Sequence, residues 1–550
     1  MALMIRRSAV VLLVLGLPAP APAQRFDVIE ATIATTHDAL RAGRTTCRAV
    51  VQQYLDRIAA YDQTGPALNA IEHVNARALA EADSLDAAMR ARRPIGALHC
   101  VPVLLKDQIE TKDMPTTYGS ALFKDFIPQR DATAVQRLEA AGAIILAKTT
   151  MGEFAARYVG SGAGIIRNAY DPTRNPSGSS GGSASGVAAN FGLVGIGEDT
   201  GGSIRGPAAV SNLVGLRPTL SLVSRFGMMP ANPTQDTMGP MTRTVADAAR
   251  VLDVIAGYDA NDPITAETVG RIPPSYTTAL RADALRGVRL GVLRTNRGPS
   301  SRDSMPPRDS TLSRDSTTPR DSAVPGDSAA LALAAEFAKV RALMERAIAD
   351  LRALGAEIVD SITIPALAAR RTGNNFETEQ ATDAYLAQHP NAPVRTLREI
   401  LLSGDVNPWR ARSLIGEVGR TTSDPGYLSV LHGREVLRVS VLKTMADQRL
   451  DAIIYMTYDA PPTLIAVDVL TNPRPADGYG RGDNRGLSPS IGFPALTVPA
   501  GFTSDSLPAG LEFLGRPFSE AALLSYGFAY EQGTKHRRPP RTAPGLRTAR

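Results

Sequence analysis

Short apolar runs alternate with helical patterns in the first part of the chain. Residues 45–61 (TTCRAVVQQYLDRIAAY) place apolar side chains at helical spacing, behind a threonine suited to cap the first turn. The run VPVLL at 101–105 predicts a buried strand, and residues 132–141 with AIILAK at 143–148 predict a helix and another strand. Such alternation favours an α/β domain with its active-site loops at strand ends.

The pattern breaks at residues 297–328, where almost no apolar residue occurs. Arg-Asp-Ser recurs there at 302, 308, 314 and 320. Such a segment cannot bury enough apolar surface to offset its ordering entropy, so we expect a disordered insertion within a domain spanning 25–540. A repeat solenoid is disfavoured because the units lack core-forming residues. The arginine-rich end, 541–550, is expected to be a disordered basic tail.

The N-terminus has the organisation of an export signal. Arg6 and Arg7 precede the apolar run AVVLLVLGL, and Ala21-Pro22-Ala23 fits a small-residue cleavage site. We expect residues 1–23 to be a cleaved signal peptide and the enzyme to be periplasmic or secreted. A retained anchor helix is the alternative; it is disfavoured because the run is short and flanked by prolines. No later segment is apolar enough to predict a membrane span.

The richest chemistry lies in residues 175–208, where two Gly/Ser clusters flank the apolar run VAANFGLVGIG. A flexible linker would not carry such a run, so the stretch predicts two hydroxyl-bearing loops held on a rigid core segment. A serine nucleophile needs a base within hydrogen-bond reach. Lys106 ends the predicted strand 101–105, where desolvation would favour the neutral amine that accepts a proton.

These motifs together resemble the amidase signature family of serine hydrolases. The resemblance rests on the strand ending in Lys106, the GSSGG loop at 178–182 and the DTGGSIRGPA loop at 199–208, and further segments follow in family order from about 45 to 538. It implies a single α/β domain with a mixed central sheet covered by helices on both faces. Lys106 would be the base, Ser179 a bridging serine on a cis peptide bond, and Ser203 the nucleophile.

The resemblance also implies supporting groups around the nucleophile. Backbone N–H groups of Thr200, Gly201, Gly202 and Ser203 would line the oxyanion hole, with Ser180 and Arg205 in supporting roles. The expected reaction is hydrolysis of a carboxylic amide, from a small molecule or a peptide, to an acid plus ammonia or an amine. It would pass through an acyl-enzyme on Ser203.

Three other functions fit parts of the sequence. The family also contains amidotransferase components that pass ammonia to an acylated tRNA, but the export signal argues against that role. A catalytically silent binding protein is disfavoured because the motif serines and Lys106 are intact. Gly178-Ser-Ser180-Gly-Gly182 also fits the nucleophile elbow of α/β-hydrolases, with Ser180 as nucleophile, yet no downstream histidine (His389, His432, His536) lies in a convincing strand-end loop.

Cysteine content and net charge limit the metals, cofactors and partners that the sequence predicts. Cys47 and Cys100 either pair in an oxidising compartment or are buried thiols, and Cys100 stands where the resembled family usually has glycine. Two cysteines and no HExxH motif predict no metal, and no organic cofactor is implied. The net charge is +6 and aromatics are 5%, without a basic helix, so no nucleic-acid partner is expected. The oligomeric state stays open.

Overall fold

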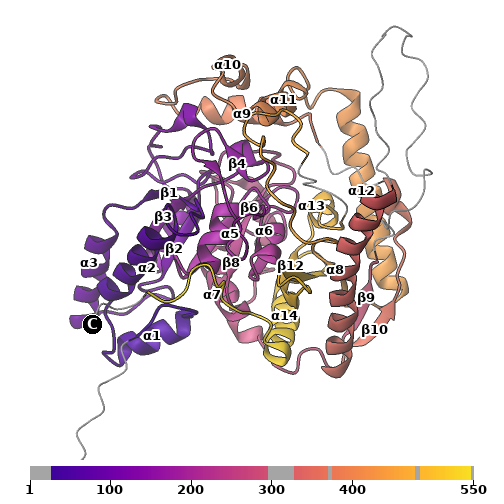
Figure 1. Cartoon of the computed structure of the whole chain (residues 1–550), viewed down its shortest axis with the longest axis horizontal. Coiled ribbons are helices and arrows are strands. Elements are labelled where there is room, and N and C mark those ends of the chain that lie inside the picture. The colour runs from indigo at the N-terminus through magenta and orange to yellow at the C-terminus, as the bar shows by residue number, and fades with distance from the viewer. Residues whose placement is uncertain (1–25, 295–326, 370–373, 477–482, 547–550) are drawn as a thin grey trace, which may run out of the picture.

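One eleven-stranded sheet runs through the computed structural model, which describes residues 26–294, 327–369, 374–476 and 483–546 (Figure 1). Its strand order is β1-β3-β2-β6-β8-β7-β12-β13-β11-β9-β10, and β4 and β5 form a separate two-stranded sheet. The predicted signal peptide and residues 297–326 of the predicted insertion lie outside the described residues.

The strands are short, mostly four to eight residues. Their bounds are β1 Ile71–Val74, β2 Pro102–Lys106, β3 Ile144–Thr149, β4 Val159–Gly160, β5 Gly164–Ile165, β6 Val194–Asp199, β7 Val214–Arg217, β8 Thr237–Thr242, β9 Arg289–Val292, β10 Glu357–Asp360, β11 Ala452–Met456, β12 Ala495–Phe502 and β13 Pro508–Leu514. The α-helices are α1 Ile33–Arg41, α2 Cys47–Tyr61, α3 Ala78–Arg90, α4 Thr133–Ala140, α5 Gly181–Ala188, α6 Arg205–Val210, α7 Val245–Ile255, α8 Asp327–Ala353, α9 Thr378–Leu386, α10 Leu397–Leu402, α11 Pro408–Ile415, α12 Pro425–Asp447, α13 Leu487–Ile491 and α14 Glu520–Thr534.

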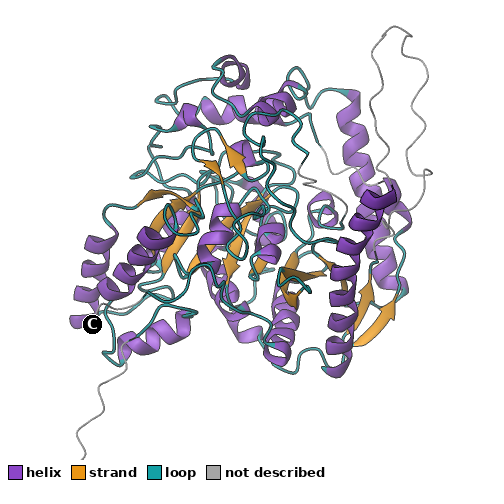
Figure 2. Cartoon of the chain, viewed as in Figure 1, coloured by secondary structure: helices purple, strands orange, loops and turns teal. Residues whose placement is uncertain are grey.

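The sheet is mixed. β2 pairs in parallel with β3 and β6, and β9 pairs in parallel with β10 and β11, whereas the strands between these two groups pair antiparallel. Helices cover both faces (Figure 2), so the central strands are buried on both sides and read as continuous apolar runs. This confirms the predicted α/β fold with a mixed central sheet.

The helix predicted at 45–61 forms as α2. Thr46 is its N-cap, and its hydroxyl oxygen accepts the backbone N–H of Ala49 at 3.1 Å, which satisfies one of the free donors of the first turn. Cys47, the first helical residue, is disulfide-bonded to Cys100, with Cα atoms 5.4 Å apart. Both cysteines are fully buried, so the bond ties α2 to the segment that leads into β2.

The prediction of a disordered tail from 541 is wrong for its first part. Residues 541–546 lie against α2, where Arg57 donates to the carbonyl of Ala543 at 2.7 Å and to that of Pro544 at 2.9 Å. Ala543 itself is buried. The buried guanidinium needs carbonyl acceptors, and this segment supplies them. At the other boundary, residues 327 and 328, assigned to the insertion, already belong to α8.

Candidate active site

Lys106 occupies the last position of β2, between β3 and β6, and its side chain is fully buried. Its Nζ lies 2.7 Å from Ser179 Oγ and 2.8 Å from Glu198 Oε2. Burial lowers the pKa of Lys106, and the charge of Glu198 acts in the opposite direction. The geometry therefore places a desolvated amine in hydrogen-bond contact with a serine hydroxyl.

Ser179 is held by the loop that enters α5. The Gly178–Ser179 peptide bond is cis, and the Ser179 carbonyl accepts the N–H of Gly152 at 3.0 Å. A Cβ on Gly178 would lie 1.6 Å from the carbonyl oxygen of Arg157, so only glycine fits this position. Close packing of backbone against backbone fixes where the Ser179 hydroxyl points.

Ser203 lies on the turn between β6 and α6, and it is 9% exposed. Asp199 holds this turn: its two carboxylate oxygens accept the N–H of Gly202 at 2.7 Å and that of Ile204 at 3.1 Å. Gly202 has φ of +120°, a conformation that side-chain-bearing residues rarely adopt. The nucleophile candidate therefore sits on a turn that one carboxylate clamps on both sides.

The hydrogen bonds of this turn decide which of the expected N–H groups are available to bind an oxyanion. The N–H of Gly202 is engaged by Asp199 and is not free to bind a ligand oxygen. Within the described part of the chain, the N–H groups of Thr200, Gly201 and Ser203 make no hydrogen bond, and Gly201 has open space beside it. These three groups remain as donors for an oxyanion.

Two glycines let the serine loops approach one another. A Cβ on Gly197 would lie 3.0 Å from both Ser180 Oγ and Ile204 Cγ1, so the neighbours of Ser179 and Ser203 both pack where a side chain would stand at this glycine. A Cβ on Gly206 would likewise lie 2.9 Å from Ser177 Oγ. The two loops thus converge on the end of β6, beside the end of β2.

Arg205 holds the Ser203 turn in place through the Asp199 carboxylate. Its Nε donates to Asp199 Oδ2 at 3.1 Å, and its other nitrogens bond the Glu512 carboxylate and the carbonyl of Arg485. Arg205 and Arg217 hold the pKa of Asp199 well below its usual range, although burial acts against them. These contacts are those of a residue that holds the turn, and the supporting role expected for Arg205 stays a prediction.

Ser180 has a structural role at the same place. Its hydroxyl donates to the carbonyl of Glu198 at 3.2 Å and lies 3.3 Å from the N–H of that residue. It therefore braces β6 against the start of α5 and does not contact Lys106. Of the downstream histidines, His389 contacts Glu110 and His536 contacts Asp350, and His432 lies within α12.

Comparison with known proteins assigns the family. The amidase family model matches residues 49–313. A probable amidase of Arabidopsis thaliana is 30% identical over 94% of this chain and 92% of its own length. The chain belongs to the amidase signature family. A glutamyl-tRNA(Gln) amidotransferase subunit from Rippkaea orientalis is 32% identical over 93% of this chain and 99% of its own.

Solved amidases share the whole fold. The native peptide amidase from Stenotrophomonas maltophilia is 34% identical, with a TM-score of 0.78 over 95% of this chain and 100% of its own. A peptide amidase in complex with the competitive inhibitor chymostatin is 35% identical, with the same TM-score over 94% and 100%. The family and the mixed sheet are therefore shown by sequence and by structure.

The amidase site contains a residue that sequence reasoning missed, Glu198. It is fully buried beside Lys106, and its second oxygen, Oε1, lies 2.5 Å from the hydroxyl oxygen of Thr200. The same hydroxyl lies 2.7 Å from Oδ1 of Asp236, just before β8. The only sequence signal was a pair of adjacent acids, Glu198 and Asp199, at the end of an apolar run.

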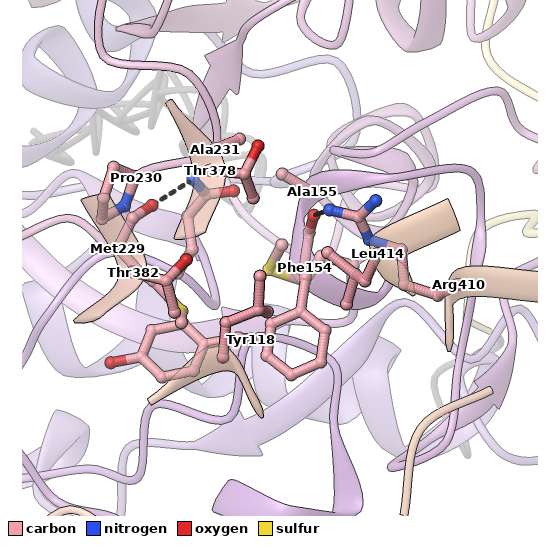
Figure 3. A pocket seen from close by; sticks show the side chains of 13 residues that line it. Tyr118, Phe154, Ala155, Met229, Pro230, Ala231, Thr378, Thr382, Arg410 and Leu414 are labelled. Atoms are coloured by element: carbon pink, nitrogen blue, oxygen red, sulfur yellow. Dashed lines mark hydrogen bonds between the residues drawn. The ribbon is translucent and has the colours of Figure 1, made fainter. Parts of the chain in front are cut away.

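A small cavity is lined mostly by apolar side chains, together with Gln108, Arg410 and two threonines (Figure 3). Its volume is about 20 Å³, room for one water molecule. Tyr118, Phe154 and Leu414 are among the side chains that surround it, and Arg410 donates to the carbonyl of Phe154 at 3.0 Å. Helices α9, α10 and α11 supply part of its lining.

No group of three or more His, Cys, Asp or Glu side chains in the described ranges is arranged to hold a metal ion. Across the same ranges, none of the helices combines the length and the apolar character that crossing a bilayer requires.

Proposed function

We propose that this protein is an exported amidase that hydrolyses a carboxylic amide through an acyl-enzyme on Ser203. The observation that carries the proposal is the 2.7 Å contact between Lys106 Nζ and Ser179 Oγ, beside the turn that presents Ser203. A buried amine can take a proton through a bridging hydroxyl, which activates a second hydroxyl as nucleophile.

The proposed steps use Ser203, Ser179 and Lys106 in turn. Ser203 Oγ attacks the amide carbon while its proton passes to Ser179 Oγ and the Ser179 proton passes to Lys106 Nζ. The free N–H groups of the turn stabilise the oxyanion, an effect worth several kcal/mol in comparable sites. The ammonium of Lys106 returns the proton through Ser179 to the leaving nitrogen, and water then cleaves the acyl-enzyme by the same relay.

Peptide C-terminal amides are the first substrates to test, because the solved structures similar to this chain include peptide amidases. The cavity of about 20 Å³ has room for one water molecule, so it does not define an acyl pocket.

Export is supported by the predicted leader and by the buried disulfide. Disulfides persist in oxidising compartments and are rare in the cytosol, so the bond between Cys47 and Cys100 agrees with a periplasmic or secreted enzyme. The mature N-terminus in the native host should lie at or near Gln24. Recovery of intact protein beginning at Met1 from the cytoplasm would overturn this part.

The catalytic proposal is tested with a serine-directed fluorophosphonate probe and an ammonia-release assay on aliphatic, aryl and peptide C-terminal amides, with glutamine included. Ser203→Ala should abolish labelling and turnover, and Lys106→Ala and Ser179→Ala should each lower kcat by roughly 10⁴-fold. The Lys106/Ser179 double variant should lose little more than either single one, because the residues act as a unit. Ser180→Ala is the matched control and should retain labelling.

Two outcomes would change the assignment. Labelling that survives Ser203→Ala but is lost in Ser180→Ala would move the nucleophile to Ser180. Ammonia release confined to glutamine would favour an amidotransferase-type reaction, the class to which the Rippkaea orientalis relative belongs, over general amide hydrolysis.

A further inference from the structure

Lys106 has an ion-pair partner that conflicts with its proposed role as a base. Glu198 Oε2 lies 2.8 Å from Lys106 Nζ, and both side chains are fully buried. A carboxylate at this distance stabilises the ammonium form, whereas the mechanism proposed above, on which this inference rests, needs the neutral amine. The charge on Glu198 must therefore change during the reaction, or Lys106 would stay protonated.

Thr200 supplies the means for such a change. Its hydroxyl lies 2.5 Å from Glu198 Oε1 and 2.7 Å from Asp236 Oδ1. A hydroxyl has one proton and can donate to only one of these oxygens. Both contacts are hydrogen bonds only if the other carboxyl carries a proton and donates it to Thr200. Glu198 and Asp236 therefore hold one proton between them.

The surrounding charges agree with this proton count. Burial, together with the charge of Glu198 when that residue is ionised, raises the pKa of Asp236 to about 7, so in that state the shared proton lies on Asp236. The other charged groups of the packed elements are paired among themselves: Asp199 with Arg205 and Arg217, Arg205 with Glu512, and Lys148 with Asp107 on the far side of β2. Arg434 of α12 bonds Thr234 and Gln235. Arg217, paired with Asp199, and Arg225, paired with Asp262, also act electrostatically on Asp236. Among the described cations, Lys106 is the one in direct contact with Glu198.

We propose that Glu198 is a positioning residue that works as a proton switch for Lys106, exchanging one proton with Asp236 through the hydroxyl of Thr200. In the resting site the proton is on Glu198, and Lys106 is an amine. When Lys106 takes the serine proton, Glu198 Oε1 gives its proton to Thr200 Oγ1, and the Thr200 proton passes to Asp236 Oδ1.

The exchange conserves the number of protons, and it places a negative charge on Glu198 at the moment when Lys106 becomes positively charged. Glu198 becomes a carboxylate beside the newly formed ammonium, and both steps reverse when the leaving nitrogen is protonated. Asp236 also borders a cavity of about 190 Å³, lined in part by Arg225 and Asp262. That volume holds several water molecules, so the outer end of the relay can exchange its proton with solvent.

The test measures the rate of fluorophosphonate labelling of the full chain against pH. In Glu198→Gln the anion beside Lys106 is gone, so the acid limb should move to lower pH by about one to three pH units. In Asp236→Asn the negative charge is confined to Glu198, so the same limb should move to higher pH. Asp262→Asn, in the same cavity, is the matched control and should leave the midpoint in place.

Opposite shifts support the switch, because a purely structural role or a distant charge would not produce them. No shift in Asp236→Asn, or a shift to lower pH in both variants, would overturn it. Thermal unfolding of each variant establishes that it is folded.

Infrared spectroscopy gives a readout that does not depend on activity. The difference spectrum of wild type minus Glu198→Gln at pH 7 should contain the C=O band of a protonated carboxyl, and its absence would overturn the proton count. Wild type that is never labelled would refute the proposed hydrolase function, whereas the infrared result would still decide whether the proton is present.

Discussion

The disulfide between Cys47 and Cys100 should contribute measurably to stability, and the backbone at Cys100 makes the prediction sharper. The bond closes a loop of 53 residues in the chain. Removing that constraint from the unfolded state costs about 4 kcal/mol in the chain-entropy model. For a chain of this size the entropy of unfolding is about 1 kcal/mol/K, so the midpoint of thermal unfolding should fall by about 4 °C.

Cys100 has φ of +59°, in the left-handed region where a side chain is strained. Glycine adopts this conformation freely. Cys47→Ala/Cys100→Gly should therefore be more stable than Cys47→Ala/Cys100→Ala by about 1 kcal/mol, although both lack the bond. Comparing these two variants separates the stabilisation by the disulfide from the strain that a side chain causes at position 100.

Thermal unfolding with and without dithiothreitol decides both points. Reductant should lower the wild-type midpoint toward that of the Cys47→Ala/Cys100→Ala protein and should leave both double variants unchanged. If the alanine double variant unfolds at the wild-type temperature, the stabilisation attributed to the bond is wrong. If the glycine variant is no more stable than the alanine variant, the backbone argument at Cys100 is wrong.

Two other predictions concern packing away from the disulfide. Gly178→Ala would drive a Cβ into the carbonyl of Arg157, 1.6 Å away; it should cost about 1–3 kcal/mol or more in a urea titration and lower the labelling rate. A chain ending at residue 540 leaves the buried Arg57 without two of its four carbonyl acceptors, those of Ala543 and Pro544, and should unfold at a lower temperature, whereas a chain ending at 546 should match full length. Equal midpoints for the two truncations would refute the role of that segment.

The fold class was predictable because its signals are local. The helix at α2 has its threonine cap, and β2 and β3 are apolar runs of strand length at the positions that were predicted. The packing of residues 541–546 was not predictable in this way. Arg57 binds backbone carbonyls 486 and 487 residues further along the chain, and a carbonyl carries no sequence signal.

The candidate site was predictable only in part. Lys106, Ser179 and Ser203 could be singled out because glycine-rich loops and a lysine at a strand end are visible in the sequence. Glu198 could not, because every residue of β6 is buried, so no alternation of polar and apolar positions shows which acid faces Lys106. Asp236 was missed as well, since it lies in a loop whose contact with Thr200 depends on tertiary packing.

The two adjacent acids of β6 should separate in their effects, because consecutive strand residues point to opposite faces. Glu198 contacts Lys106, whereas Asp199 clamps the Ser203 turn and is neutralised by Arg205 and Arg217. Asp199→Asn should therefore misplace the nucleophile and lower the labelling rate roughly 100-fold at every pH. It should shift the acid limb far less than Glu198→Gln does.

The labelling rate of Asp199→Asn has to be measured on folded protein. Two arginines lose part of their counter-charge in this variant, so its thermal midpoint should be lower than that of the wild type. Labelling is compared well below that midpoint. A rate that returns to the wild-type value at high pH would mean that Asp199 acts through the charge of Lys106 and not through the geometry of the turn. In that case the separate roles assigned to Glu198 and Asp199 would be wrong, and both acids would act by changing the pKa of Lys106.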